Sequence, residues 1–305
     1  MKTQVPEDRK IARTTEHREA QLLIQSAFGL AHQLGLRTVI IQADEMSDVR
    51  LIEKMEVSKQ LIWLVRTDDF KKSEKIRANQ KILSVPDTGL SRMSQVKIGM
   101  FLAIFNGFIE IEESVLCVCG IAGSERLDTI LVANGKRDFP WLKSLSLVGR
   151  EPLLATKEFG RLVDIALAIG AEGREGRPLG TTFILGSRAE LKPHLRQLVL
   201  NPFSGHRAKR RDIHSSEILD TIREFAALDG AFIVNRKGVL LSAGTYLEAE
   251  SNRVKIRSGL GARHRSAAAL TAVTNSVALV VSSSSRHVTV FHRGQTLLEL
   301  QEATS

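Results

Sequence analysis

Short apolar runs that alternate with helix-like segments constrain the fold of this chain more than any other feature. In the first half, the runs 38–41, 61–65 and 115–119 are continuous and rich in aliphatic, often β-branched residues. Between such runs, apolar residues recur at helical spacing, as in 22–34 and 92–106. Strands that are apolar on both faces are typical of a mostly parallel sheet that helices cover on both sides. The sequence therefore predicts an α/β fold.

Length and pattern together predict two domains. The chain has 305 residues, about twice the roughly 150 residues of an average domain. Residues 1–16 are polar and lack apolar periodicity, so we expect a flexible N-terminus. Residues 17–150 are expected to form the first α/β domain, which includes a helix near 47–58. Residues 151–305 are expected to form the second, in which a helix over 156–171 leads into a strand.

The charge balance points to an anionic partner without identifying it. The formal net charge is +9, from 43 Lys and Arg residues against 34 Asp and Glu residues. Such an excess attracts nucleotides, nucleic acids or anionic membrane surfaces. With only two Trp and one Tyr, a surface that stacks unpaired bases is disfavoured. No apolar run approaches the roughly 20 residues that span a bilayer, and the charged N-terminus does not fit a signal peptide. We therefore expect a cytoplasmic protein without a membrane partner.

The chain has only two cysteines, Cys117 and Cys119, which lie one residue apart in an apolar run. Two sulfur ligands alone do not form a zinc site, and a disulfide between such close positions of one strand is strained. We predict buried, reduced thiols.

The segment 228–231 has the sequence Leu-Asp-Gly-Ala and lies between a predicted helix and a predicted strand. Ser215 or Ser216 is expected to cap that helix. A carboxylate at such a junction can hold a divalent cation, and Gly230 lets a ligand approach the backbone closely. Because most Asp-Gly pairs are simple turns, the segment alone leaves both interpretations open for Asp229.

The segment 259–266 has the sequence Gly-Leu-Gly-Ala-Arg-His-Arg-Ser and opens a helix that the following alanines favour. Free backbone N–H groups, the positive end of the helix dipole and two guanidinium groups together favour a phosphate ligand. The alternative is that Arg263 and Arg265 only decorate a surface. Cations at a helix N-terminus cost about 0.3–1 kcal/mol each, which favours an anionic partner such as a triphosphate. No Walker loop occurs in the chain.

Two further polar stretches each allow two interpretations. Residues 207–211 hold four basic side chains, which suit either a solvated connection or contact with nucleic acid. Residues 282–285 are four serines at the end of a predicted strand, where they form either a polar turn or a contact with phosphate.

Segments 228–231 and 261–267, in this order and followed by an apolar strand that ends in serine, resemble the diadenylate cyclase domain family. The family signatures are Asp-Gly-Ala and Gly-Thr/Ala-Arg-His-Arg. The resemblance extends from about residue 152 to about residue 302 and implies an α/β domain whose mixed central sheet is flanked by helices. The first half resembles the pyruvate-kinase C-terminal-like domain that precedes the cyclase in the mainly archaeal branch of this family.

This resemblance implies a role for each matching position. Asp229 would hold a catalytic Mg²⁺ or Mn²⁺ and would act with Arg263, His264 and Arg265. The positions implied to contact the nucleotide are Gly230, Ala231, Tyr246, Leu247, Gly261, Ala262, Ser266 and Ser282. The chain departs from some branches of the family, which carry glutamates where Ser283 and Ser284 stand.

The resemblance also implies ATP as substrate, cyclic di-AMP as product and a homo-oligomer that contains face-to-face cyclase pairs. The first domain is expected to regulate or assemble the enzyme. Two alternatives stay open, a sensor of nucleotide or cyclic di-AMP with little or no turnover and a nucleic-acid-binding protein. The intact Asp229 favours the enzyme, and the absence of a helix-hairpin-helix motif argues against nucleic acid as a partner.

Overall fold

The structure is a computed structural model of the chain. It describes residues 7–46, 52, 59–66, 80–85, 90–121, 123–124, 126–142, 152–249, 254, 257 and 259–301. The chain divides into two compact units, Met1–Pro140 and Trp141–Glu302. This division falls ten residues before the predicted boundary between residues 150 and 151. The helix predicted near 47–58 lies, apart from residue 52, outside the described residues.

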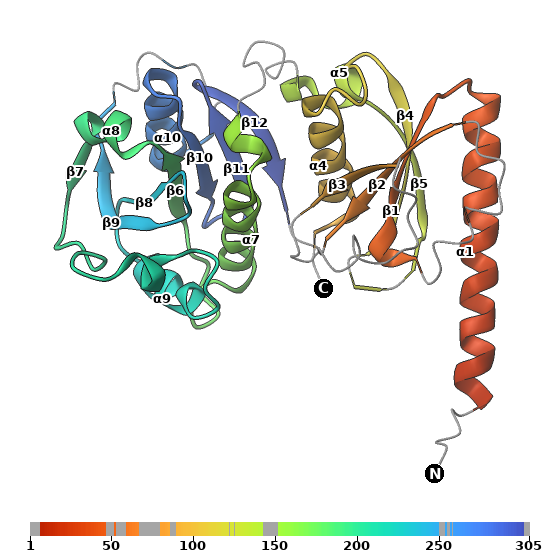
Figure 1. The fold of residues 1–305 in the computed structure, drawn as a ribbon, viewed down its shortest axis with the longest axis horizontal. Coiled ribbons are helices and arrows are strands. Elements are labelled where there is room, and N and C mark those ends of the chain that lie inside the picture. Colours follow the sequence, from red (N-terminus) through yellow and green to blue (C-terminus); the bar gives the residue numbers. More distant parts are fainter. Residues whose placement is uncertain are drawn as a thin grey trace. The chain divides into compact units, whose positions relative to one another are not determined.

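Unit 1 is a five-stranded sheet covered by helices (Figure 1), with the strand order β3-β2-β1-β4-β5. Strands β1 to β4 are parallel and β5 is antiparallel to β4, which confirms the expected mostly parallel α/β fold. The elements are α1 Glu7–Gln33, β1 Thr38–Gln42, η1 Ala43–Glu45, β2 Gln60–Val65, β3 Lys81–Ser84, α4 Arg92–Phe105, β4 Ser114–Cys119, β5 Thr129–Asn134, α5 Gly135–Asp138 and η2 Pro140–Leu142.

The two long helices of unit 1 cover opposite faces of its sheet. On one face, Ile24 of α1 belongs to a buried cluster that includes Trp63 of β2. On the other face, a side chain at Gly99 of α4 would lie 2.7 Å from Leu64, the next residue of β2. Because neighbouring residues of a strand point to opposite faces, both faces of the sheet are buried, as the continuous apolar runs predict.

Cys117 and Cys119 of β4 are buried and free of disulfides, which confirms the prediction of reduced thiols. Burial raises the pKa of Cys119 to about 11 and raises the pKa of Cys117 further. Both thiols therefore stay protonated at neutral pH and react poorly.

The N-terminal helix α1 begins at Glu7 and so includes residues 7–16, for which the sequence lacks apolar periodicity. The flexibility expected for this N-terminus stays a prediction. This segment lacks an apolar stripe but is rich in Glu, Arg, Lys and Ala, which have high helix propensity. The end of the helix agrees with the sequence, since Gly35 adopts a φ of 65° just after it. None of the described helices is long and apolar enough to cross a membrane.

Unit 2 is a seven-stranded mixed sheet with the order β12-β11-β10-β6-β8-β9-β7, as the family resemblance implies. Only β6 and β8 pair in parallel. The elements are η3 Pro152–Ala155, α7 Lys157–Glu172, β6 Thr181–Gly186, α8 Arg188–Leu191, η4 Lys192–His194, β7 Leu195–Gln197, η5 Ala208–Arg211, α9 Ile218–Phe225, β8 Ala231–Asn235, β9 Leu240–Leu247, α10 Ala262–Val273, β10 Val277–Val281, β11 Val288–His292 and β12 Gln295–Leu300.

Helices α7 and α10 cover opposite faces of this sheet. Val280 belongs to a buried cluster that includes Ala267 and Leu270 of α10. Val281, the next residue of β10, lies on the other face, where a side chain at Gly170 of α7 would approach it to 3.4 Å. The core of unit 2 therefore fixes the start of α10 relative to the strand ends beside it.

One predicted helix start is wrong. Ser215 and Ser216 precede α9, but the helix begins at Ile218 with Glu217 as its N-cap, and no side chain caps it. The backbone N–H of Ser215 donates to Asp212 O, so the two serines belong to a turn before the helix.

Candidate active site

Several strand ends meet at one end of the unit 2 sheet. Ala231, the first residue of β8, lies opposite Thr182 of β6 and Thr245 near the end of β9. Strand β10 runs antiparallel to β6 and ends here at Val281, just before Ser282. The strand register therefore brings together residues that are distant in the sequence.

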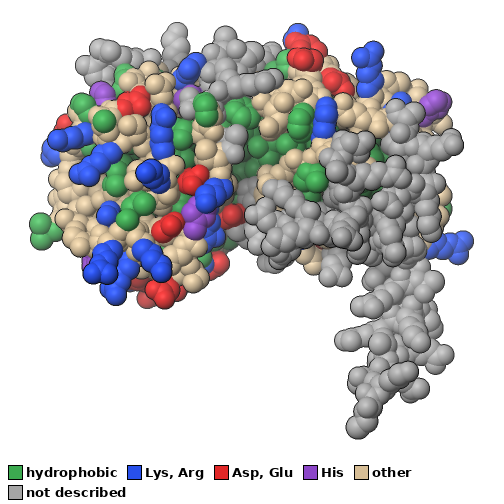
Figure 2. Space-filling view, viewed as in Figure 1, with side chains coloured by type: hydrophobic (Ala, Val, Ile, Leu, Met, Phe, Trp, Pro, Cys, Tyr) green, Lys and Arg blue, Asp and Glu red, His purple; other side chains and the backbone are tan. Residues whose placement is uncertain are grey.

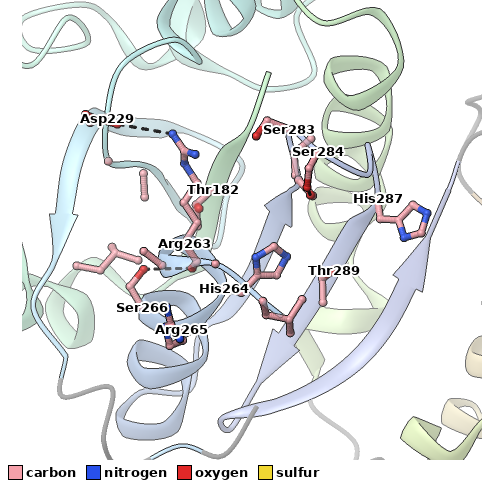
Figure 3. A pocket seen from close by; sticks show the side chains of 18 of the residues that line it. Thr182, Asp229, Arg263, His264, Arg265, Ser266, Ser283, Ser284, His287 and Thr289 are labelled. Carbon is pink, nitrogen blue, oxygen red and sulfur yellow. Dashed lines mark hydrogen bonds and ion pairs between the residues drawn. The ribbon is translucent and has the colours of Figure 1, made fainter. Parts of the chain in front are cut away.

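A pocket of about 1160 Å³ opens at this end of the sheet (Figure 3). All twelve residues that the sequence predicts for the site line this one pocket: Asp229, Gly230, Ala231, Tyr246, Leu247, Gly261, Ala262, Arg263, His264, Arg265, Ser266 and Ser282. Their individual roles stay predictions. Their convergence places one potential metal ligand and two guanidinium groups around a volume that suits a nucleotide.

The backbone conformation at the floor of the pocket requires a glycine at position 230. Its φ is 104°, and a side chain there would lie 2.6 Å from the N of Thr245 and 2.7 Å from the C of Gly244. Only glycine fits such a close approach of β8 to β9. The tight junction turns Asp229, the preceding residue, out toward solvent.

The Asp229 carboxylate is 93% exposed, and its Oδ1 lies 3.6 Å from Nη2 of Arg263 (Figure 3). This ion pair is long and solvated, so it contributes little stability. Both groups are therefore available to a ligand: the carboxylate to a cation and the guanidinium to a phosphate.

Helix α10 points its N-terminus at the pocket. Gly261 is the N-cap and no side chain caps the first turn, which leaves backbone N–H groups free for an anion. The Ser266 hydroxyl donates to Arg263 O at 3.1 Å, inside this turn. Arg265 is exposed, whereas Arg263 is partly buried against the pocket. This geometry leaves room for an anion at the helix start, and the anion site itself stays a prediction.

His264 differs from the arginines beside it because it is buried, at 7% exposure. Its ring meets Phe291 edge-on, with ring centroids 6.1 Å apart. Burial lowers the pKa of His264, and this effect outweighs the nearby Glu299 carboxylate, which raises it. The imidazole is therefore neutral at pH 7 and anchors the first turn of α10 to the sheet rather than adding positive charge.

The serine segment 282–285 forms a tight turn at the pocket wall. The Ser282 hydroxyl lies 3.2 Å from that of Ser284 and accepts the N–H of Ser285 at 3.3 Å. Ser283, Ser284 and Ser285 are exposed and line the pocket. The turn interpretation is correct for the local structure, and the same hydroxyls also face the pocket.

Sequence reasoning missed several pocket residues. Arg196 of β7 lies with its guanidinium 5.1 Å from the centroid of the Tyr246 ring and pairs with Glu248 at 2.7 Å. Glu299 of β12 pairs with Arg257 at 3.5 Å. Arg196 and Glu299 come from the two edge strands of the sheet, β7 and β12, and their place at the pocket depends on sheet order, which no local motif reveals. The remaining missed polar residues are Thr182, Thr245, His287 and Thr289.

The basic patch lies away from the pocket. Asp212, just after 207–211, forms a bridge with Val239, at the opposite end of β8 from Asp229. Arg211 is structural, because its guanidinium donates to His206 O and Leu240 O. The rest of the patch is exposed, and Figure 2 shows Lys and Arg side chains gathered over the surface of this unit.

The donor set fits a divalent cation that is shared with a bound phosphate. Within the described ranges, no group of three or more His, Cys, Asp or Glu side chains could hold a metal ion. Mg²⁺ typically takes one or two carboxylates together with substrate phosphates and water. Asp229 supplies one carboxylate, while Glu299 lies on a strand four places away from β8 in the sheet. Ser283 and Ser284 supply none.

Comparisons with known proteins agree with these motifs. Residues 168–296 match the family described as DisA bacterial checkpoint controller nucleotide-binding. A diadenylate cyclase of Methanocaldococcus jannaschii is 38% identical over 177 residues, which cover 57% of this chain and 55% of that protein. A diadenylate cyclase of Haloferax volcanii is 30% identical over 207 residues, which cover 68% of this chain and 74% of that protein. The chain thus spans little more than half the length of the first relative.

Solved structures show weaker likenesses. A double mutant of DacA from Staphylococcus aureus is 20% identical with a TM-score of 0.34, covering 46% of this chain and 84% of that one. A pyruvate kinase of Cryptosporidium parvum is 17% identical with a TM-score of 0.33, covering 38% of this chain and 22% of that one. TM-scores this low do not establish a common fold, so the sequence relatives decide the family. On their evidence, the chain belongs to the diadenylate cyclase family.

Proposed function

We propose that this chain condenses two ATP molecules into cyclic di-AMP and two pyrophosphates. The observation that carries the proposal is the convergence of Asp229 with Arg263 and Arg265 on one pocket, beside the free N-terminus of α10. The names of the two archaeal relatives support it. The two proposed domains divide the work, with the pocket of residues 151–305 performing the reaction and residues 17–150 regulating or assembling the enzyme.

In this proposal, α10 and its two arginines bind the triphosphate. The N–H groups of the first turn and the guanidinium of Arg263 face the same volume. Together they neutralise charge on the phosphates and orient the α-phosphorus for in-line attack. The adenosine is proposed to occupy the part of the pocket lined by Leu247, the ring of Tyr246 and the backbone at Gly230.

Asp229 would hold the divalent cation, Mg²⁺ or Mn²⁺, through its carboxylate. Such a cation lowers the pKa of the ribose 3′-hydroxyl. The 3′-oxygen forms a bond to the α-phosphorus of the other ATP, the bond from that phosphorus to the bridging oxygen breaks, and pyrophosphate leaves. The hydroxyl proton passes to solvent. No covalent enzyme nucleophile is needed.

The proposal requires two copies of the site. One pocket with one Asp229 and one set of arginines binds one ATP, whereas the product has two equivalent phosphodiester bonds. Two pockets placed face to face across a two-fold axis form both bonds. The active unit is therefore a homodimer or a larger assembly that contains such pairs.

The test is incubation of the purified full chain with ATP and Mg²⁺ or Mn²⁺, with products resolved by mass. Cyclic di-AMP and pyrophosphate in a 1:2 ratio support the proposal. Tight binding of ATP or cyclic di-AMP without any product would instead identify a sensor, the alternative that the sequence leaves open.

A further inference from the structure

Two loops of unit 2 bring exposed basic side chains together at the end of β8 that lies away from the pocket. The loop 207–211 adjoins the turn between β8 and β9, because Asp212 forms a bridge with Val239 and the N–H of Ile213 donates to Gly238 O at 2.9 Å. Apart from Arg211, the cations of the two loops are all exposed, and together they are called the basic face: Arg207, Lys209, Arg210, Arg236 and Lys237.

Hydrogen bonds hold both loops in defined conformations. The Arg211 guanidinium donates to Leu240 O at 2.7 Å and so ties the first loop to β9. In the second loop, the N–H groups of Lys237 and Val239 both donate to Asn235 Oδ1, at 2.9 and 3.0 Å. The cations therefore extend from an ordered backbone, and a partner has to order only their side chains.

No acid neutralises the basic face. Among the residues that the structure describes, none of its five side chains forms an ion pair with Asp or Glu, whereas other arginines of this unit pair with glutamates: Arg174, Arg196 and Arg223. Two acids adjoin the face. The Asp212 carboxylate accepts the N–H of His214, and Glu158 would lie 3.3 Å from a side chain at Gly238. The mutual repulsion of five like charges costs free energy, which an anionic partner offsets.

The net charge of the chain is concentrated in unit 2. Residues 141–302 contain 23 of the 43 Lys and Arg residues but only 15 of the 34 Asp and Glu residues. Unit 2 thus accounts for eight of the nine excess positive charges. The arginines at the start of α10 contribute two cations, whereas the basic face contributes five. The positive charge of this unit therefore has a second centre outside the pocket.

The composition of the basic face indicates the kind of partner that it fits. No large hydrophobic side chain is exposed in 204–214 or 235–239, whereas the core of a protein interface is apolar. Exposed aromatic rings of Phe, Tyr or Trp, on which unpaired bases stack, are therefore absent from these two segments as well. Three guanidinium groups and two ammonium groups instead suit the phosphate oxygens of a regular, paired backbone.

We propose that the basic face binds the phosphodiester backbone of a double-stranded nucleic acid without reading its base sequence. Of the two interpretations that the sequence allows for 207–211, contact with nucleic acid then holds, and the loop is more than a solvated connection. Backbone contacts made by exposed cations require no helix-hairpin-helix motif. Because the basic face lies away from the pocket, this binding is independent of the proposed cyclase activity.

Fluorescence anisotropy of the full chain with a labelled DNA duplex of arbitrary sequence tests this binding. The face variant replaces Arg207, Arg210 and Arg236 by glutamine. The control variant replaces an equal number of exposed arginines of unit 1 by glutamine: Arg18, Arg37 and Arg137. At about 50 mM salt, the face variant should bind about tenfold more weakly than wild type, and the control within about twofold of it. The slope of log K against log salt concentration should become shallower by about 2–3 in the face variant, as three lost phosphate contacts require.

Two results of this assay would overturn the proposal. Equal losses in the face and control variants would mean that binding follows net charge alone. Wild-type protein that binds no duplex at low salt would mean that the basic face has no such partner. Melting temperatures of both variants near that of wild type serve as the check on folding.

Competition identifies the surface and the class of partner. A saturating non-hydrolysable ATP analogue should leave duplex affinity within about twofold, because it occupies the pocket and not the basic face. Displacement of the duplex by the analogue would place the duplex in the pocket and contradict the proposal. Single-stranded DNA, polyglutamate and phosphatidylserine vesicles should each compete less well than unlabelled duplex, and stronger competition by any of them would contradict it too. Duplex DNA and duplex RNA share the backbone chemistry, so tighter binding of either supports the proposal and identifies the source.

Discussion

Asp229 is held in an exposed position by the glycine that follows it, and its only close charged partner among the described residues is Arg263 at 3.6 Å. We expect Asp229→Asn to abolish synthesis while nucleotide binding and folding persist, because the amide keeps the shape but loses the charge that binds a cation. The measurement is product formation by mass, with the melting temperature as a check on folding. Asp220→Asn, another exposed acid of unit 2, is the control and should retain activity. Turnover of Asp229→Asn within about tenfold of wild type, or about 1.4 kcal/mol, would refute the metal-ligand role.

The arginines of α10 define a second prediction at the residue scale. Replacing Arg263 and Arg265 together by alanine should weaken ATP binding, since a charge-assisted hydrogen bond contributes about 1.5–3 kcal/mol. The lower end applies because both side chains are partly or fully exposed. Calorimetric titration with a non-hydrolysable analogue measures the change. The control is a double variant with Arg207 and Arg210 replaced by alanine, which loses the same amount of charge outside the pocket. If both double variants bind the ATP analogue with equal affinity, the arginines of α10 do not form the triphosphate site.

At the scale of elements, the close approach of β8 to β9 depends on Gly230. Gly230→Ala should lower the free energy of unfolding by more than Gly205→Ala does. Both glycines have positive φ, 104° and 78°, but a side chain at 205 meets nothing within 4 Å, whereas one at 230 meets backbone at 2.6 Å. The Gly205 variant should therefore cost only the conformational term, about 1–2 kcal/mol. Urea unfolding measures both, and equal costs would show that the β8 to β9 contact tolerates a side chain.

Because His264 of α10 is buried, we expect the free energy of unfolding of unit 2 to depend on pH. Its pKa is lowered from 6.5, mainly by burial, so the unfolded chain binds a proton more readily than the folded one. The free energy of unfolding should therefore decrease as pH falls below about 6.5, and His264→Gln should show a smaller decrease. Urea unfolding at pH 8 and pH 5 tests this, with His214→Gln at an exposed site as the control. Identical pH dependence in wild type and His264→Gln would contradict it.

Most elements were predictable because local patterns specify them. Strand β10 ends at Val281, directly before the serines 282–285 that the sequence places at the end of a strand, and α10 follows the glycines and alanines that indicate it. Strand β7 was missed, since its three residues Leu195–Gln197 are too few for a period-2 pattern. Consequently Arg196 and Leu198, which line the pocket, were missed as well. Sheet order places these residues at the pocket, and pairing between distant strands is not encoded locally.

At the scale of the whole molecule, length and pattern predict two domains, and the structure divides into two compact units between Pro140 and Trp141. The predicted domain bounds and domain roles stay predictions. The division after Pro140 comes from which side chains share a core, and that depends on tertiary packing. The proposed assembly also belongs to this scale, because the proposed reaction calls for two such sites, whereas the described part of unit 2 has one set of Asp229, Arg263 and Arg265 at one pocket.

The most direct test of the paired-site account is the activity of mixed assemblies. Wild-type and Asp229→Asn chains carry different tags and are co-expressed in equal amounts. They are purified without selection for either tag, so that the sample contains pairs formed at random. Only pairs of two wild-type chains close both phosphodiester bonds, so cyclic di-AMP per total chain should fall to about a quarter of the wild-type value. A value of one half, in proportion to the wild-type chains present, would mean that each chain works alone and would contradict the account.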